Sequence, residues 1–342
     1  MARSKKLAIL SFLPFLVLGA LFPLAAGGQA PVVNGAPITV RTLAITAFKS
    51  GSSKIRFGKL EFLGGLVMAS PNGELGAMSA IRMLPDGRRF IVVMDTGYWA
   101  DGRILRDDKG RLAGLSDFSI SEMIGPDGFR KDRKQDMDAE GLALDAANAY
   151  VSFEVLHRID TYPLAGYRTS ARTASQLPLL PPEAVLRSNG GLETLVKAPA
   201  DGPLGGSLIH VAERSYNKAG DFFAGVLSGP RKGAFFVKRH APYDVTDGAF
   251  LPDGSLLLLE RRFGLVDGIG TRIRRFNAAD IKGQGETIDG EVVFEADYSH
   301  QIDNMEGIDV FKGPDGDTRI LLISDDNHSL LERNLMLEFR LV

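Results

Sequence analysis

The sequence predicts an all-β protein, a β-propeller of six blades, with five blades as the alternative. Three observations support this expectation. Glycine accounts for 39 of the 342 residues and clusters with Pro, Asp and Asn between short apolar runs, as in chains rich in tight turns. One hairpin pattern bounded by acidic residues recurs five times, at a spacing of about 50–60 residues that suits a propeller blade. Residues 335–342 alternate apolar and polar side chains, as a half-buried strand does.

The clearest copy of the hairpin pattern spans residues 304–327. Two β-forming runs lie on either side of a Gly-Pro-Asp-Gly turn at 313–316. Glu306 lies at the start of the first run and Asp325 at the end of the second. Because the first strand of a hairpin begins where the second ends, these two carboxylates should be close neighbours. Such a pair repels unless a cation or a shared proton lies between the two groups.

The same device occurs four more times along the chain. The corresponding pairs are Glu140 and Glu154, Glu193 and Glu213, Asp247 and Glu260, and, with serine in the first place, Ser79 and Asp95. A propeller places equivalent strand ends around one central axis. The repetition therefore predicts a ring of acids at one mouth of the channel, contributed by neighbouring blades.

The two ends of the chain are expected to close the propeller together. Leu43 to Phe48 and Phe57 to Met68 alternate well enough to be strands, and they are the natural partners of residues 335–342. A blade shared between the termini removes exposed sheet edges. Five hairpins plus this composite blade give the count of six. No linker divides the chain, so residues 29–342 form one expected domain.

The N-terminus has the features of a secretory signal peptide over residues 1–28. Basic residues at positions 3, 5 and 6 precede an apolar stretch from Leu7 to Leu24, and small residues follow it. We expect cleavage near Gln29 and export to the periplasm or the extracellular space, with no membrane span in the mature chain. An uncleaved membrane anchor is the alternative, because the apolar stretch is just long enough to span a bilayer.

Composition narrows the classes of partner and chemistry. The chain has no cysteine, which rules out disulfides, thiolate metal ligands and a cysteine nucleophile. Its net charge is −2, and loss of the basic N-terminal segment would make the mature domain more acidic. Bulk attraction to nucleic acid is therefore not expected. We expect a monomer that takes a small anionic ester or a phosphate-containing ligand.

The acidic ring is the first candidate site. Hard oxygen ligands at this density suit Ca²⁺, with Mg²⁺ as the alternative cation. The residues proposed as metal ligands are Glu140, Glu154, Glu193, Glu213, Asp247, Glu260, Glu306 and Asp325. The competing interpretation is structural: each acid could accept backbone hydrogen bonds or pair with an arginine.

Basic residues follow the second acid of several hairpins. Arg214 follows Glu213, Arg261 follows Glu260, and His328 lies three residues after Asp325. We take Arg214, Arg261 and His328 as the candidate catalytic residues, because cations beside a metal site suit an oxyanion. Charge compensation is the alternative, since neighbouring residues of a strand point to opposite faces. The sequence lacks the G-x-S-x-G motif of serine hydrolases.

Four motifs together resemble the phytase-like β-propeller family, described as "esterase-like activity of phytase". They are EGLAL with YVSFE, NGGLETL with VAER, DGAFLPDGSLLLLER, and NMEGIDV with LLISDDN, and the likeness runs from about residue 60 to the end. The resemblance implies a secreted propeller and a metal-dependent hydrolase of phosphate or carboxylate esters. The chain departs from propeller phytases in lacking their run resembling DADDPA, for which DMDAEG at 136–141 is only a faint echo. A non-catalytic ligand-binding or scaffolding propeller of the cell envelope, with a structural cation, is the second interpretation.

Overall fold

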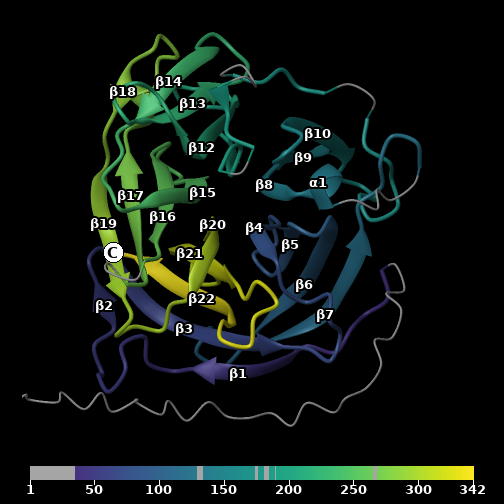
Figure 1. The fold of residues 1–342 in the computed structure, drawn as a ribbon. Coiled ribbons are helices and arrows are strands. Elements are labelled where there is room, and N and C mark those ends of the chain that lie inside the picture. Colours follow the sequence, from purple (N-terminus) through teal and green to yellow (C-terminus); the bar gives the residue numbers. More distant parts are fainter. Residues whose placement is uncertain (1–34, 129–133, 174–175, 181–184, 189, 265–267) are drawn as a thin grey trace, which may run out of the picture.

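The computed structural model describes residues 35–128, 134–173, 176–180, 185–188, 190–264 and 268–342. Within these ranges the strands form five sheets arranged around a central axis, as Figure 1 shows. Each sheet is one blade of a five-bladed β-propeller. The proposed signal peptide at 1–28 lies outside the described residues. No helix in the described ranges is long and apolar enough to cross a membrane.

The five blades, numbered in chain order, have the following strands. Blade 1 contains β4 (Met78–Met83), β5 (Arg89–Met94), β6 (Tyr98–Arg106) and β7 (Leu112–Glu122). Blade 2 contains β8 (Ala139–Leu144), β9 (Asn148–Phe153) and β10 (Arg158–Pro163). Blade 3 contains β11 (Thr194–Lys197), β12 (Leu208–Tyr216), β13 (Phe222–Val226), β14 (Gly233–Val237) and β18 (Thr287–Ile288).

Blade 4 contains β15 (Asp244–Phe250), β16 (Leu256–Arg262), β17 (Gly270–Phe276) and β19 (Glu291–Asp297). Blade 5 contains β20 (Asn304–Lys312), β21 (Thr318–Asp325), β22 (Asn334–Leu341), β3 (Leu60–Ala69) and β1 (Arg41–Ile45), with β2 (Arg56–Phe57) beside β3. The short helix α1 (Lys134–Met137) precedes β8, and a 3₁₀ turn covers Ala278–Asp280.

The first strand of each blade lines the axis. β4 contacts β8, β8 contacts β11, β11 contacts β15, β15 contacts β20, and β20 returns to β4. All five hairpins expected from the sequence are therefore present as the two innermost strands of a blade. Because each hairpin starts and ends at the same end of the axis, the first and last residues of all five hairpins meet there.

The expected count of six blades was wrong, and the alternative of five is correct. The hairpin of β20 and β21 had been counted separately from the composite blade of the two termini. In the structure β22 pairs with β21 on one side and with β3 on the other, with Leu335 opposite Val67. The last hairpin and the terminal strands are therefore one sheet. The expected pairing of N- and C-terminal strands is confirmed.

Apolar side chains fill the space between the blades. Blades 4 and 5 share one continuous core, and blades 5 and 1 share another. Trp99 is fully buried and packs edge-on against Tyr162, at 5.1 Å between ring centroids, and against Tyr167 at 5.0 Å. The only tryptophan of the sequence is thus a packing residue between blades 1 and 2.

Candidate active site: an acidic mouth at one end of the axis

A β-bulge marks the start of the inner strand in four of the five blades. An extra residue interrupts the register between Met78 and Ala80, between Ala139 and Leu142, between Val245 and Asp247, and between Met305 and Gly307. Such a bulge turns one side chain away from the regular alternation. We define the inner ring as the residues at this position in the five blades. They are Ser79, Glu140, Glu193, Thr246 and Glu306.

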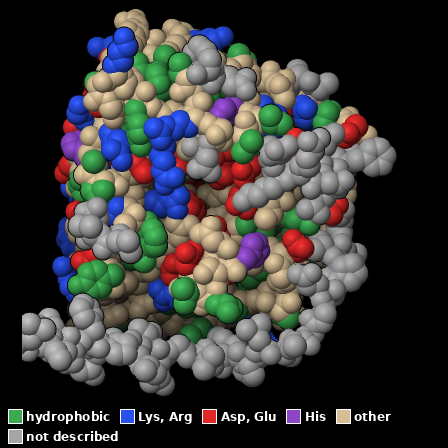
Figure 2. Space-filling view, in the orientation of Figure 1, with side chains coloured by type: hydrophobic (Ala, Val, Ile, Leu, Met, Phe, Trp, Pro, Cys, Tyr) green, Lys and Arg blue, Asp and Glu red, His purple; other side chains and the backbone are tan. Residues whose placement is uncertain are grey.

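The second strand of each blade contributes one more residue at the same end. In each blade this residue lies near the end of the second strand, next to the start of the first strand. We call these five residues the outer ring. Its members are Asp95, Glu154, Glu213, Arg261 and Asp325. The two rings together are called the mouth. Figure 2 looks onto it: acidic side chains gather in a hollow near the middle of the face, with Lys and Arg side chains along one edge.

Six of the eight proposed metal ligands belong to the mouth, and two do not. Asp247 lies one residue beyond its bulge and Glu260 one residue before its outer-ring position, so both point elsewhere. Asp247 is fully buried against Arg82, and Glu260 is fully buried against Arg272 and Arg274. These two acids have the structural role that the competing interpretation gave them. Blade 4 instead presents Thr246 and Arg261 to the mouth.

Arg82 crosses the axis below the mouth. Its guanidinium donates to both carboxylate oxygens of Asp247 on β15, at 2.8 and 2.9 Å. It also donates to the carbonyl of Ile308 on β20 at 2.8 Å and to that of Leu195 on β11 at 3.0 Å. One side chain of β4 thereby joins three other inner strands. This ion pair forms a floor under the acidic rings.

Three carboxylates at blade 2 converge on one point. Asp138, Glu140 and Glu154 each offer an oxygen within 4.8 Å of the others. Burial, together with the neighbouring Glu154 and Asp138, raises the pKa of Glu140 well above its usual value. Burial also raises the pKa of Glu154 to about 6, although hydrogen bonds oppose the shift. Three hard oxygen donors that repel one another suit a divalent cation.

The glycine pair before Glu193 holds one oxygen of Glu154. The backbone N–H of Gly190 donates to Glu154 Oε1 at 2.8 Å, and the N–H of Gly191 donates to the same atom. Gly190 has φ +90°, and a Cβ there would lie 2.6 Å from the Cβ of Arg214. Only glycine fits this approach. The pair Gly190–Gly191 therefore fixes the orientation of one metal-ligand candidate.

Three further acids of the mouth, Glu193, Glu306 and Asp325, have raised pKa values. Burial, and the charges of Glu140 and Glu154, raise the pKa of Glu193 well above its usual value. Burial raises the pKa of Glu306 to about 8 even though Arg261 opposes the shift. Burial, aided by Asp95, raises the pKa of Asp325 to about 6. Without a cation, the mouth therefore holds protons at neutral pH.

Arg261 is the one cation of the two rings. Its guanidinium lies 2.7 Å from Glu306 and 3.1 Å from Glu213, and it donates to the side chain of Asn304. Burial alone would lower its pKa, but the two glutamates raise it, so Arg261 stays charged. Within the described structure its Nε is buried and has no hydrogen-bond partner. The position of Arg261 makes it the natural contact for an anion in the mouth.

The other two candidate catalytic residues lie further out. Arg214 forms ion pairs with Glu213 at 3.0 Å and with Asp244 at 3.1 Å, and its side chain is 40% exposed. His328 is exposed on the loop after β21, where its backbone N–H donates to Asp326 Oδ1 at 3.0 Å. In the described part of the chain, no hydrogen bond or ion pair links the His328 ring to either ring of the mouth. Arg214 thus borders the mouth, and His328 lies on its outer rim.

Sequence reasoning missed several members of the site. Asp138 and Asn304 were not singled out, although each stands two residues before an inner-ring glutamate. Asp95 was recognised as a hairpin end but was not proposed as a ligand. Thr246 was missed because Asp247 looked like the better match. The sequence signal for Asp138 and Asn304 is their place two residues before Glu140 and Glu306, whereas the bulge that selects Thr246 is seen only in the structure.

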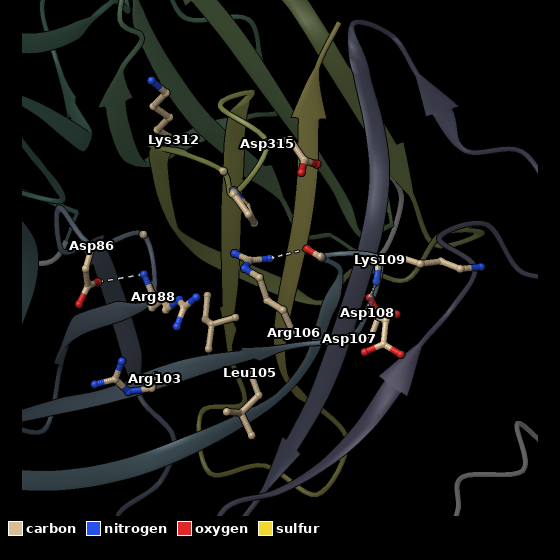
Figure 3. Close-up of a pocket in the computed structure, with 15 residues that line it drawn as sticks. Asp86, Arg88, Arg103, Leu105, Arg106, Asp107, Asp108, Lys109, Lys312 and Asp315 are labelled. Atoms are coloured by element: carbon tan, nitrogen blue, oxygen red, sulfur yellow. Dashed lines mark hydrogen bonds between the residues drawn. The ribbon is translucent and has the colours of Figure 1, made fainter.

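A separate cleft of about 860 Å³ lies at the opposite end of blades 1 and 5 (Figure 3). The turn before β5, the turn after β6 and the turn after β20 line it. Both basic and acidic side chains line its walls, and two of its aspartates are engaged in their own turns. Asp86 pairs with Arg89 at 2.6 Å and Asp107 pairs with Arg111 at 2.7 Å. The cleft therefore has no clear preference for a charged ligand.

Comparisons with known proteins give one family match and several distant structural likenesses. The family described as "Phytase-like: Esterase-like activity of phytase" matches residues 73–328. No curated protein sequence matches the chain. The solved structure of PQQ-bound aldose sugar dehydrogenase from Streptomyces coelicolor is similar at 12% identity and a TM-score of 0.42, over 89% of this chain and 99% of that one.

Two further solved structures are similar over most of this chain. An endo-arabinase from Bacteroides thetaiotaomicron is similar at 13% identity and a TM-score of 0.45, over 78% of this chain and 94% of that one. Hydrazine synthase from Kuenenia stuttgartiensis is similar at 12% identity and a TM-score of 0.37, over 74% of this chain. The match spans 58% of the length of the synthase chain. None of these structural likenesses bears on the activity of the chain.

Proposed function

Because the chain belongs to the phytase-like family, we propose that its acidic mouth is the active site of an exported, metal-dependent hydrolase of small anionic esters. The main support for this proposal is that three carboxylates and an arginine lie together in the mouth. Asp138, Glu140 and Glu154 converge at blade 2, and Arg261 faces the same mouth from blade 4. A phosphate or carboxylate ester needs both kinds of contact. Export is proposed from the basic, apolar and small-residue segments at the N-terminus.

The cation is assigned to the three carboxylates of blade 2. Asp138, Glu140 and Glu154 would hold Ca²⁺, or Mg²⁺ as the alternative, because all their donors are hard oxygens. When bound, such a cation would polarise the ester oxygen and lower the pKa of a water molecule. The N–H groups of Gly190 and Gly191 keep Glu154 oriented for this task.

The other side of the mouth would bind the anionic part of the substrate. Arg261 is charged, buried and linked to Glu306 and Glu213, so it is positioned before substrate arrives. Arg214, on the rim, adds a second positive charge that can approach from outside. Glu306, with a pKa of about 8, is protonated at neutral pH and can donate a proton from its carboxyl group to a leaving oxygen.

Hydrolysis of the anionic p-nitrophenyl phosphate tests the proposal directly, and the neutral p-nitrophenyl acetate tests whether the anionic group is needed. Turnover should require added Ca²⁺ or Mg²⁺, disappear after chelation, and be lost in Glu140→Gln/Glu154→Gln. Glu291→Gln is the matched control. Glu291 is the first residue of β19, the outermost strand of blade 4, and it forms an exposed ion pair with Lys59. A protein that binds the cation but hydrolyses neither ester would contradict the proposal and favour the scaffolding propeller with a structural cation.

A further inference from the structure

Four large hydrophobic side chains stand exposed at the mouth end of blades 4 and 5. The exposed fractions are 93% for Leu331, 91% for Leu330, 83% for Tyr298 and 78% for Phe263. Leu330 and Leu331 follow β21, Tyr298 follows β19, and Phe263 follows β16. β16 and β21 end at the mouth, whereas β19 is the outermost strand of blade 4, so Tyr298 lies further from the axis. Figure 2 shows hydrophobic side chains on this face, around the acidic hollow.

The loop that carries the two leucines is held in place by polar contacts. Asn327 Nδ2 donates to Glu332 Oε2 at 2.7 Å, and Asn334 Nδ2 donates to Asp326 Oδ2 at 2.7 Å. Asn327 and His328 both adopt positive φ, at 47° and 50°. These contacts fix the base of the loop, while the side chains of Leu330 and Leu331 remain exposed. The two leucines are therefore exposed because the conformation of the loop is fixed by these contacts.

The same loop is tied to the connection that carries Tyr298. Arg333 donates to Asp303 Oδ2 at 3.2 Å, to Gln301 Oε1 at 2.9 Å and to the carbonyl of Ile302 at 3.0 Å. Asp303 directly precedes Asn304, whose side chain donates to Glu306 at 2.7 Å. The exposed leucines and the inner ring are thus connected through a short series of fixed contacts.

We propose that this rim docks the mouth onto a lipid surface, with Leu330 and Leu331 inserted into the apolar layer. The substrate would then be a phosphate or carboxylate ester of a membrane lipid, an inference about substrate class that rests on the proposed function. Tyr298 suits the headgroup level, where an aromatic ring with a polar tip is favoured. A lipid phosphate at that level would face Arg261 and the carboxylates of blade 2.

The shape of the rim favours lipid over a protein partner. Stable protein interfaces bury about 800 Å² on each partner across a continuous, packed patch. Here two leucines protrude from one loop, and Tyr298 and Phe263 stand on separate connections. A fluid apolar layer can surround each protruding side chain separately. The acids inside the hollow argue for a zwitterionic surface, because an anionic one would be repelled.

Flotation of the purified protein with phosphatidylcholine vesicles, in Ca²⁺-containing buffer, tests the docking. The wild-type protein should float with the vesicles, and Leu330→Ser/Leu331→Ser should reduce the bound fraction by about tenfold or more. Leu105→Ser is the matched control: Leu105 is 44% exposed but lies on β6 at the other end of the propeller, where Figure 3 labels it. It should float like the wild type.

Two results would overturn the docking. One is a wild-type protein that stays in the soluble fraction, or a leucine variant that floats equally well. The other is a leucine-dependent dimer in vesicle-free sedimentation, which would make the rim a contact between copies. The vesicle readout is independent of turnover. Flotation without ester hydrolysis would support the docking and reject the hydrolase. Hydrolysis of soluble esters without flotation would support the hydrolase and reject the docking.

Discussion

At the scale of single residues, Arg261 distinguishes the mouth from a plain ring of acids. It occupies the outer-ring position that carries an acid in the other four blades. Its partners Glu306 and Glu213 come from the two neighbouring blades, at 2.7 and 3.1 Å. A charged hydrogen bond to a substrate oxygen contributes about 1.5–3 kcal/mol. Arg261 should therefore control affinity for the anionic part of a substrate.

Replacing Arg261 tests this role. Arg261→Gln should raise KM for an anionic ester roughly ten- to hundredfold, in line with the loss of one charged hydrogen bond. Arg261→Lys should recover only part of the loss, because an ammonium group cannot reproduce the planar guanidinium fork. The matched control is Arg262→Gln, since Arg262 donates to Tyr243 Oη at 3.0 Å instead. Equal KM values for Arg261→Gln and Arg262→Gln would rule out anion binding by Arg261.

At the scale of elements, the five inner strands depend on the buried pair of Arg82 and Asp247. Both side chains are almost fully buried, and the pair links β4 to β11, β15 and β20. Removing one partner of such a pair leaves an uncompensated charge, at a cost of about 3–5 kcal/mol. Replacing both with apolar residues costs much less, because no charge remains buried.

Urea unfolding of three variants measures this dependence. Arg82→Leu should lower the free energy of unfolding by about 3–5 kcal/mol, and Arg82→Leu/Asp247→Leu should restore a large part of it. Arg89→Leu, which removes an exposed pair with Asp86, should change stability by at most about 1 kcal/mol. A double variant that is less stable than Arg82→Leu would show that the contacts to backbone carbonyls, rather than the buried charges, dominate.

At the scale of the whole molecule, the mouth couples stability to pH. The pKa values of Glu306, at about 8, and of Glu154 and Asp325, at about 6, lie above those of free acids. The folded state thus binds more protons than the unfolded chain. The associated stability is complete at low pH, below the ordinary carboxyl range, and is lost as pH rises through the folded-state values. In the presence of a chelator, the melting temperature should fall between about pH 5 and pH 8. A flat or rising profile would contradict the shifts.

A bound cation should reverse this loss, because it replaces the protons that reduce the repulsion. Ca²⁺ that binds only the folded state adds about 2.7 kcal/mol at a hundredfold excess over its dissociation constant. The rise in melting temperature should be larger at pH 8 than at pH 6. Glu140→Gln/Glu306→Gln should abolish the response and leave the metal-free protein folded, and slightly more stable at pH 8. Melting curves unmoved by Ca²⁺, Mg²⁺ and Mn²⁺ alike would exclude a metal site in the mouth.

The sequence by itself determined the local features of this protein. Short apolar runs and the turn residues between them, which are Pro-Asp-Gly in three of the five hairpins, specify each hairpin locally, so all five hairpins and the strand at the C-terminus could be located. Spacing then placed Glu306 and Asp325 at one end of a hairpin, since that follows from chain geometry alone. The family resemblance depended on the same short motifs.

Only the tertiary structure decided the blade count and the membership of the mouth. Whether β22 pairs with β21 within one sheet is a contact between strands that no local pattern encodes. A single bulge residue shifts the register of β15, which turns Asp247 toward Arg82 and brings Thr246 to the mouth. Because side chains alternate along a strand, an error of one residue moves a carboxylate from the site into the core.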